Sequence, residues 1–298
     1  MLSRRKLRLS RIIPERFLPK GLRSRAAVVP VIRLYGPIGM PSFPNQGSLS
    51  LAGIAAQLEA AFEVEDARAV ALLIRSPGGS PAQSHMMYQR IRALATEHKR
   101  PVFAFIEDVG ASGGYMLACA ADEIFADPTS IVGSIGVVSA GFGLTGLIEK
   151  LGVERRVYTA GTSKAMLDPF LPEKAEDVVR LKDLQADVHD SFVGLVKESR
   201  KDRLRGADGD LFNGAFWTGR KALELGLVDG LGDVRSVMRA RFGDEVELQL
   251  VAAPGRGGLL RFLMPSSSVP EAAPASLIRA DDVLAALEAR ALWGRYGL

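Results

Sequence analysis

Ser112 is the residue of this sequence best placed to act as a nucleophile. It stands in Gly110-Ala111-Ser112-Gly113-Gly114, after the apolar run Pro101–Ile106 and before a short helical segment, Tyr115–Ala121. Glycine permits a tight turn and the close approach of a substrate, and a helix N-terminus presents free N–H groups to a developing oxyanion. A serine that merely caps a helix suits the same position, so the local sequence leaves both roles open.

A histidine is a poor candidate for the base that would activate this serine. The Gly-x-Ser-x-Gly spacing matches the nucleophile turn of α/β-hydrolases, which needs an Asp and then a His later in the chain. The only later histidine, His189, lies deep in the charged segment Glu173–Lys201, and His85 and His98 precede the serine. A Ser-His-Asp triad is therefore not expected.

A lysine can replace the histidine where burial disfavours its ammonium form. Lys164 is the candidate by its context, since it follows Ala160-Gly161 after an expected strand and precedes Asp168-Pro169-Phe170. A surface lysine in a loop is the competing interpretation. The single cysteine, Cys119, excludes an internal disulfide and is expected to pack as a small apolar residue.

The elements that must position these residues alternate between strands and helices. The expected strands are Ala27–Tyr35, Ala69–Ile74, Pro101–Ile106, Glu123–Ala126, Ile131–Val138, Val153–Tyr158 and Val246–Val251. The expected helices are Leu49–Phe62, His85–Thr96, Tyr115–Ala121, Leu144–Leu151, Glu173–Lys201 and Val234–Phe242. This alternation predicts βαβ units and an α/β fold with mainly parallel strands and flanking helices.

Charge is concentrated at the start of the 298-residue chain. Residues 1–25 carry nine Lys or Arg and one acid, a net charge of +8, which leaves −4 for the rest because the total is +4. Apolar residues interleave with these charges, so two interpretations stay open: an interfacial helix on anionic lipid, or a disordered basic leader. No apolar run suits a signal peptide or a transmembrane helix, and we expect a cytoplasmic or membrane-peripheral protein that binds no nucleic acid.

Five motifs together resemble the signal peptide peptidase A/SohB family of Ser–Lys peptidases. In chain order they are Ser76-Pro77-Gly78-Gly79, Ala111-Ser112-Gly113-Gly114-Tyr115, Val132-Gly133-Ser134-Ile135-Gly136-Val137, Gly161-Thr162-Ser163-Lys164 and Gly226-Leu227-Val228-Asp229. The resemblance runs from about residue 28 to 251. It implies a crotonase-like, Clp-protease-like fold for a peptidase domain at 26–252. Charge and composition add a leader at 1–25 and a tail at 253–298, with a Pro/Gly/Ser linker and a helix at Asp281–Trp293.

By this resemblance Ser112 is the nucleophile, Lys164 its base and Ser134 the serine that hydrogen-bonds the lysine amine. The oxyanion donors would be backbone N–H groups of Gly113 and of Gly78 or Gly79. The resemblance also implies a homo-oligomer with sites near subunit interfaces, and hydrophobic peptide substrates such as remnant signal peptides. Whether Lys164 acts in its own chain or from a neighbouring subunit stays open.

Two other functions compete with a peptidase. A crotonase-type acyl-CoA enzyme uses a similar backbone oxyanion hole, with carboxylates near the reacting carbon, and Glu107 and Asp108 precede the glycine turn. A noncatalytic oligomeric scaffold with the same fold is the second. No clustered His/Cys spacing and no phosphate-binding P-loop occur, so neither a metal nor another cofactor is expected.

Overall fold

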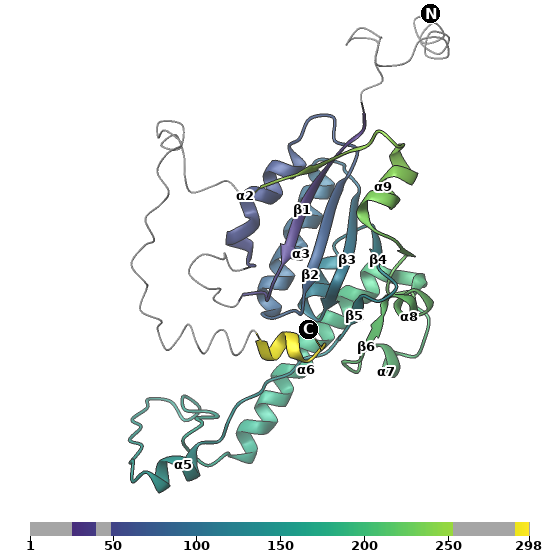
Figure 1. The fold of residues 1–298 in the computed structure, drawn as a ribbon. Coiled ribbons are helices and arrows are strands. Elements are labelled where there is room, and N and C mark those ends of the chain that lie inside the picture. The colour runs from purple at the N-terminus through teal and green to yellow at the C-terminus, as the bar shows by residue number, and fades with distance from the viewer. Residues whose placement is uncertain (1–25, 40–48, 253–289, 298) are drawn as a thin grey trace, which may run out of the picture.

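One mainly parallel β-sheet organises the protein (Figure 1). The structure is a computed structural model that describes residues 26–39, 49–252 and 290–297. The described strands form an eight-stranded sheet, and they are β1 Val28–Tyr35, β2 Val70–Ser76, β3 Val102–Ala111, β4 Glu123–Ala126, β5 Ile131–Gly133, β6 Phe216–Thr218, β7 Gly230–Leu231 and β8 Glu247–Leu250. The basic leader, the linker and the start of the predicted C-terminal helix lie outside the described residues.

The sheet has the strand order β6-β5-β3-β2-β1-β8, with β4 paired to β3 and β7 paired to β4. Strands β1, β2 and β3 run parallel and are joined by helices, as the predicted βαβ units require. Along one edge of β3, the segment Phe103–Ile106 pairs with β4 and the segment Val109–Ala111 pairs with β5. Only the described pair β5–β6 is antiparallel. The predicted α/β fold with a mainly parallel sheet is confirmed.

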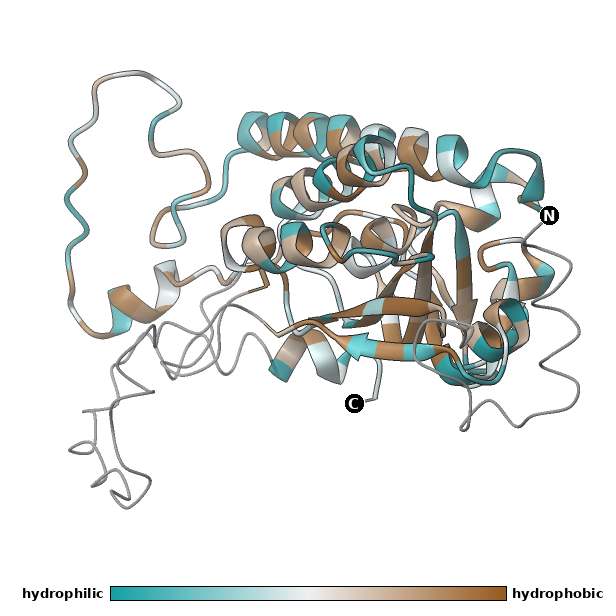
Figure 2. Ribbon diagram, turned by 90° about the horizontal axis from the view of Figure 1, so that it is seen from above, coloured by the Kyte–Doolittle hydropathy of each residue, from teal (hydrophilic) through white to brown (hydrophobic). Residues whose placement is uncertain are grey.

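Both faces of the central strands are buried, which explains their continuous apolar runs. In β2, Leu72 and Ile74 face one core, while Ala71 and Leu73 face a second core on the opposite side. Figure 2 shows the apolar strands between layers of helices. The described helices are α2 Leu51–Phe62, α3 Pro81–Glu97, α4 Gly113–Ala118, α5 Thr145–Lys150, α6 Ala175–Arg200, α7 Asp208–Leu211, α8 Gly219–Glu224 and α9 Val234–Phe242, with a 3-10 turn at Lys201–Arg203.

Several boundaries differ from the sequence prediction for identifiable reasons. Helix α3 begins four residues earlier than predicted, because the Ser80 hydroxyl accepts a hydrogen bond from the Gln83 N–H and Pro81 occupies the first helical position. Strand β5 ends at Gly133 rather than Val138, because Ser134 has a φ of 53° and leaves the strand. The strand predicted at Val153–Tyr158 is wrong: this segment has no regular structure and pairs with no described strand.

Residues 137–174, between β5 and α6, form an arm that projects from the sheet and contains α5 (Figure 1). No residue of this arm is buried, although it carries many apolar side chains. The N-terminal half of α6 extends with the arm, and its Val179 and Leu184 are more than half exposed, whereas Phe192 and Val196 near its other end are buried in the core. The body and the arm thus meet along one long helix.

Candidate active site

Ser112 and Ser134 lie side by side at the carboxyl ends of two paired strands. Strand β3 pairs with β5 so that Ala111 is opposite Gly133, and the Ser112 N–H donates to the Gly133 carbonyl at 2.8 Å. Paired strands lie about 5 Å apart, so the two serines are neighbours. Both have positive φ angles, 52° and 53°, which non-glycine residues rarely adopt. Such strained residues cluster at functional sites.

The Ser112 hydroxyl makes no hydrogen bond with the described residues of this structure. Ser112 occupies the position before α4, as the capping interpretation requires, but its hydroxyl makes no capping hydrogen bond with that helix. Its carbonyl accepts from the N–H groups of Tyr115 and Met116 at 2.9 and 3.0 Å, which fixes the turn. The structure therefore separates the two roles that the sequence left open: the backbone begins the helix and the hydroxyl is left available.

Gly78 brings the end of β2 against the same turn. A Cβ atom at Gly78 would lie 2.7 Å from the Ser112 Cβ and 2.9 Å from the Gly113 nitrogen, so only glycine fits there. The Gly113 N–H, in the first turn of α4, has no partner within its own helix. The Ile38 N–H donates to the Gly78 carbonyl, and the Ile38 carbonyl accepts from the Ser80 N–H. Because Ile38 bonds the residues on either side of Gly79, the Gly79 N–H points away from Ile38. The Gly78 N–H donates to the Ser76 hydroxyl at 3.3 Å, so the N–H groups of Gly113 and Gly79 are the candidate oxyanion donors.

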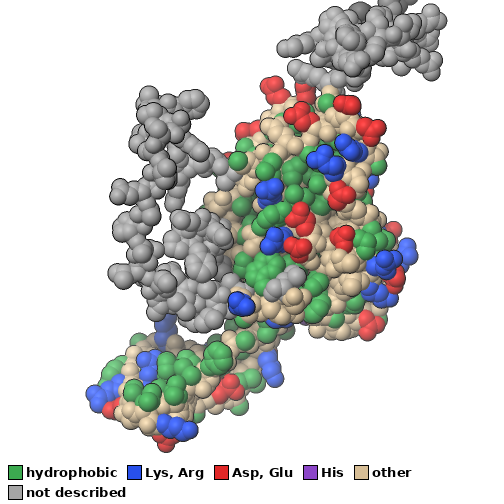
Figure 3. Space-filling model, in the orientation of Figure 1, with side chains coloured by type: hydrophobic (Ala, Val, Ile, Leu, Met, Phe, Trp, Pro, Cys, Tyr) green, Lys and Arg blue, Asp and Glu red, His purple; other side chains and the backbone are tan. Residues whose placement is uncertain are grey.

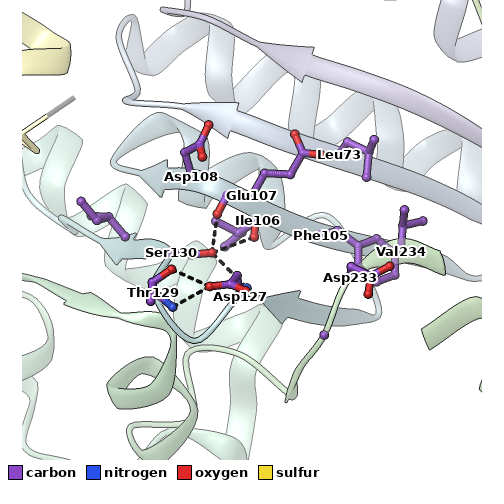
Figure 4. A pocket seen from close by; sticks show the side chains of 12 residues that line it. Leu73, Phe105, Ile106, Glu107, Asp108, Asp127, Thr129, Ser130, Asp233 and Val234 are labelled. Carbon is purple, nitrogen blue, oxygen red and sulfur yellow. Dashed lines mark hydrogen bonds between the residues drawn. The ribbon is translucent and has the colours of Figure 1, made fainter. Parts of the chain in front are cut away.

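A hydrogen-bonded loop holds β5, and with it Ser134, against β3. The Ser130 hydroxyl donates to the Ile106 carbonyl at 3.0 Å and accepts from the Asp127 N–H at 3.0 Å. The Asp127 carboxylate in turn accepts from the Thr129 N–H and hydroxyl (Figure 4). These residues line a cavity of about 560 Å³ beside β3, and neither predicted catalytic serine lines it. We therefore assign this cluster to positioning β5 rather than to chemistry.

The motif Gly226-Leu227-Val228-Asp229 anchors the helix that follows the nucleophile. The buried Tyr115 hydroxyl, in α4, donates to the Leu227 carbonyl at 2.7 Å. Asp229 binds the fully buried Arg200 through two hydrogen bonds of 2.8 Å and also contacts Arg203. Burial alone would raise the pKa of Asp229, but the hydrogen bonds and charge of Arg200, with the Ile124 N–H and Arg203, outweigh it and lower that pKa.

The cysteine and the three histidines lie in surroundings that give none of them a catalytic partner among the described residues. Cys119 is buried, as predicted, and burial raises the pKa of its thiol to about 12, which keeps it protonated. His85 stacks on Tyr88 and His98 contacts Phe62. His189 lies in the middle of α6, where its Nε2 atom is buried without a hydrogen-bond partner among the described residues.

The structure does not bring Lys164 to the two serines within one chain. The Lys164 side chain is exposed on the arm, and the neighbouring Ser163 hydroxyl accepts from Arg180 at 2.9 Å. At the other end of α6, the Ser199 hydroxyl donates to the Cys119 carbonyl, just after α4. Arg180 and Ser199 are about 28 Å apart along the helix axis at the usual rise per residue. Lys164 therefore lies at the arm end of α6, and the serines lie near its other end.

One contact at the site was missed by the sequence interpretation. Tyr296, near the C-terminus, is buried against β3 and β5, and its hydroxyl donates to the Ser134 hydroxyl at 3.2 Å. Two aromatic residues, Trp293 and Tyr296, follow a tail rich in Pro, Ser and Ala. That aromatic pair is the only signal that the sequence offers, and periodicity alone does not say where it docks.

The comparisons with known proteins agree with the motifs. The sequence profile of peptidase family S49 matches residues 95–247, which include both serines, Lys164 and the Asp229 motif. The chain belongs to this family. The α/β sheet and the two paired serines are therefore those of a chain from a peptidase family.

Three relatives show how the match is distributed. The chain is 53% identical over 294 residues to a protein of Brucella abortus named Na(+)/H(+) antiporter NhaA, covering 97% of this chain and 39% of that protein. It is 30% identical to the chloroplastic serine protease SPPA of Arabidopsis thaliana, over 81% of this chain and 34% of the relative. It is 32% identical to a putative signal peptide peptidase SppA of Enterococcus faecium, over 59% and 51%. The chain thus spans between about a third and a half of these relatives. No described helix is long and apolar enough to cross a membrane.

Proposed function

We propose that this chain is a serine peptidase in which Ser112 is the nucleophile and Lys164, supplied by a second copy of the chain, is the general base. The observation that carries the proposal is the pairing of two strained serines, Ser112 and Ser134, beside a glycine that nothing larger can replace. Membership of peptidase family S49 and the name of the Arabidopsis relative support the same chemistry.

The proposed mechanism uses groups of the protein and one water molecule. A neutral lysine amine takes the proton from the Ser112 hydroxyl as its oxygen attacks the peptide carbonyl, and the Ser134 hydroxyl orients the amine. The N–H groups of Gly113 and Gly79 stabilise the oxyanion of the tetrahedral intermediate. The protonated lysine then gives its proton to the leaving amine. Water repeats the cycle on the acyl-enzyme and releases Ser112.

A second copy is proposed because the apolar side chains of the arm are left exposed in a single chain. Exposed apolar side chains gather on it (Figure 3), and they are Val138, Phe142, Leu147, Leu151, Val153 and Tyr158, each more than half exposed. Apolar surface of this kind marks an interaction site. The same arm carries Lys164, whose amine needs desolvation to serve as a base. Packing of the arm on a neighbouring copy would bury the apolar side chains and the lysine together.

The proposed substrates are hydrophobic peptides, including remnant signal peptides. The name of the Enterococcus relative points to signal peptides. Val109, Ala111 and Ile131, near the two serines, form an apolar cluster on which Tyr296 packs in this structure, and such a cluster suits apolar side chains. A peptidase that acts on such remnants would meet them near a membrane, where the basic leader 1–25 would favour anionic lipid.

Labelling by a fluorophosphonate tests the nucleophile directly. This probe forms a covalent bond only with an activated serine, so intact-mass spectrometry of the wild-type chain should show one adduct. We expect Ser112→Ala to remove the adduct, and Ser139→Ala, a change to an exposed serine of the arm, to leave it. Wild-type protein that is folded and assembled but takes up no probe would contradict the proposal and favour the scaffold alternative.

A further inference from the structure

The two candidate oxyanion donors stand on different segments of the chain. The Gly79 N–H belongs to the turn between β2 and α3, and the Gly113 N–H belongs to the first turn of α4. Donors of this kind stabilise an oxyanion only when both reach the same oxygen atom, at about 3 Å. The site therefore needs a group that holds the two segments at a fixed separation. Ile38, a residue outside the five motifs, contacts both segments.

The backbone of Ile38 fixes the direction of the Gly79 N–H. The Ile38 N–H donates to the Gly78 carbonyl at 2.8 Å, and the Ile38 carbonyl accepts from the Ser80 N–H at 2.9 Å. Because the Gly78 carbonyl and the Gly79 N–H share one trans peptide plane, the first of these bonds also orients that N–H. The two backbones lie so close that a Cβ atom on Gly79 would clash with the Ile38 carbonyl oxygen.

The side chain of Ile38 lies against Gly113. Its Cδ1 atom is 3.2 Å from the point that a Cβ atom of Gly113 would occupy, a spacing tighter than ordinary van der Waals contact. The hydroxyl of Ser84, in the first turn of α3, crowds the same point and donates to the Ser80 carbonyl at 2.8 Å. Ile38 and Ser84 are both fully buried. The start of α4 therefore packs directly on Ile38 and on the first turn of α3.

We propose that Ile38 is a positioning residue for the oxyanion hole. Its backbone orients the Gly79 N–H and its Cδ1 methyl group sets the place of Gly113, so one residue determines the separation of the two donors. The inference rests on the proposed function and adds to it a residue that acts through the two glycines. An error in this separation weakens the hydrogen bonds to the tetrahedral intermediate and leaves substrate binding unchanged, which lowers kcat and not KM.

Ile38→Val tests this role in the full-length chain, because valine lacks only the Cδ1 atom that contacts Gly113. We expect kcat for a hydrophobic peptide to fall about tenfold, with KM unchanged. Ile91→Val is the matched control, since Ile91, in α3, is fully buried in the same core and its variant loses the same atom. This control should keep the wild-type kcat. Equal kcat in the two variants, with an active wild type, would overturn the proposal.

A pair of inhibitors separates positioning from general packing. The Ser112 oxygen adds to the carbonyl carbon of a hydrophobic peptide aldehyde, and the hemiacetal oxygen then lies between the two donors, whereas the matching peptide alcohol binds without this bond. Ile38→Val should weaken inhibition by the aldehyde about tenfold and leave inhibition by the alcohol unchanged. Equal weakening of both would overturn the positioning role, because altered packing impairs the binding of either peptide. A wild-type chain that binds the aldehyde no more tightly than the alcohol would instead refute the proposed chemistry.

Discussion

Replacement of Ser112 by Ala, or of Lys164 by Ala, is expected to reduce kcat/KM for a hydrophobic peptide by about 10⁴-fold or more, with the fold unchanged. The loss is large because Ser112 and Lys164 act as one unit, so the loss of either residue prevents formation of the acyl-enzyme. Cleavage of a fluorogenic peptide gives the rate, and thermal unfolding checks the fold.

Two matched variants separate the role of the pair from general effects of the substitutions. Lys150→Ala removes another exposed lysine of the arm, in α5, and Ser139→Ala removes another exposed serine. Both should retain wild-type kcat/KM within about twofold, as surface substitutions usually do. Substantial turnover by the Ser112→Ala protein would exclude this residue as the nucleophile.

Replacement of Asp229 by Ala should cause the largest loss of stability among single substitutions near the site. Asp229 is the carboxylate partner of Arg200, whose side chain is fully buried, so its loss leaves a charged group without compensation inside the protein. Breaking a buried pair in this way costs about 3–5 kcal/mol. Urea unfolding measures the change. Glu224→Ala, which removes the exposed ion pair with Lys221, is the control and should leave the midpoint nearly unchanged.

The Asp229 pair also predicts how stability depends on pH. The pKa of Asp229 is lowered in the folded protein, whereas an unfolded chain has an aspartate pKa of about 3.9. Its contribution is therefore fully present above about pH 4 and is lost as the pH falls through the folded value. Stability measured from pH 7 to pH 2.5 should fall less steeply below pH 4 in Asp229→Asn than in the wild type. Equal slopes would show that this carboxylate is not linked to folding.

The fold was largely predictable because its central strands are buried on both faces. A continuous apolar run such as Ala69–Ile74 is typical of a strand that is buried on both faces. The observed strand β2, at Val70–Ser76, overlaps that run. The segment Val153–Tyr158 alternates polar and apolar residues as a strand does, yet it has no described strand to pair with. Periodicity reports what a segment is suited to, and the presence of a partner decides whether a strand forms.

The site was predictable in its parts and only partly in its arrangement. The glycines around Ser112 mark the turn, and the register of β3 and β5 then places Ser134 beside it. The position of Lys164 depends on the direction of α6 and the arm, which no local pattern specifies. The docking of Tyr296 depends on Val109, Ala111, Ile131 and Phe216, which come from three strands, so the sequence of the tail alone does not reveal it.

Complementation between inactive subunits tests the central claim most directly. Ser112→Ala and Lys164→Ala chains, carrying different affinity tags, are co-expressed and purified through both tags, and peptide hydrolysis is measured on the mixed assembly. If each site combines the serine of one copy with the lysine of another, mixed assemblies restore from about a quarter of the sites in a large ring to about half in a dimer. Activity between about a quarter and a half of the wild-type value is the predicted result. Activity no higher than that of either variant alone would contradict a site shared between copies.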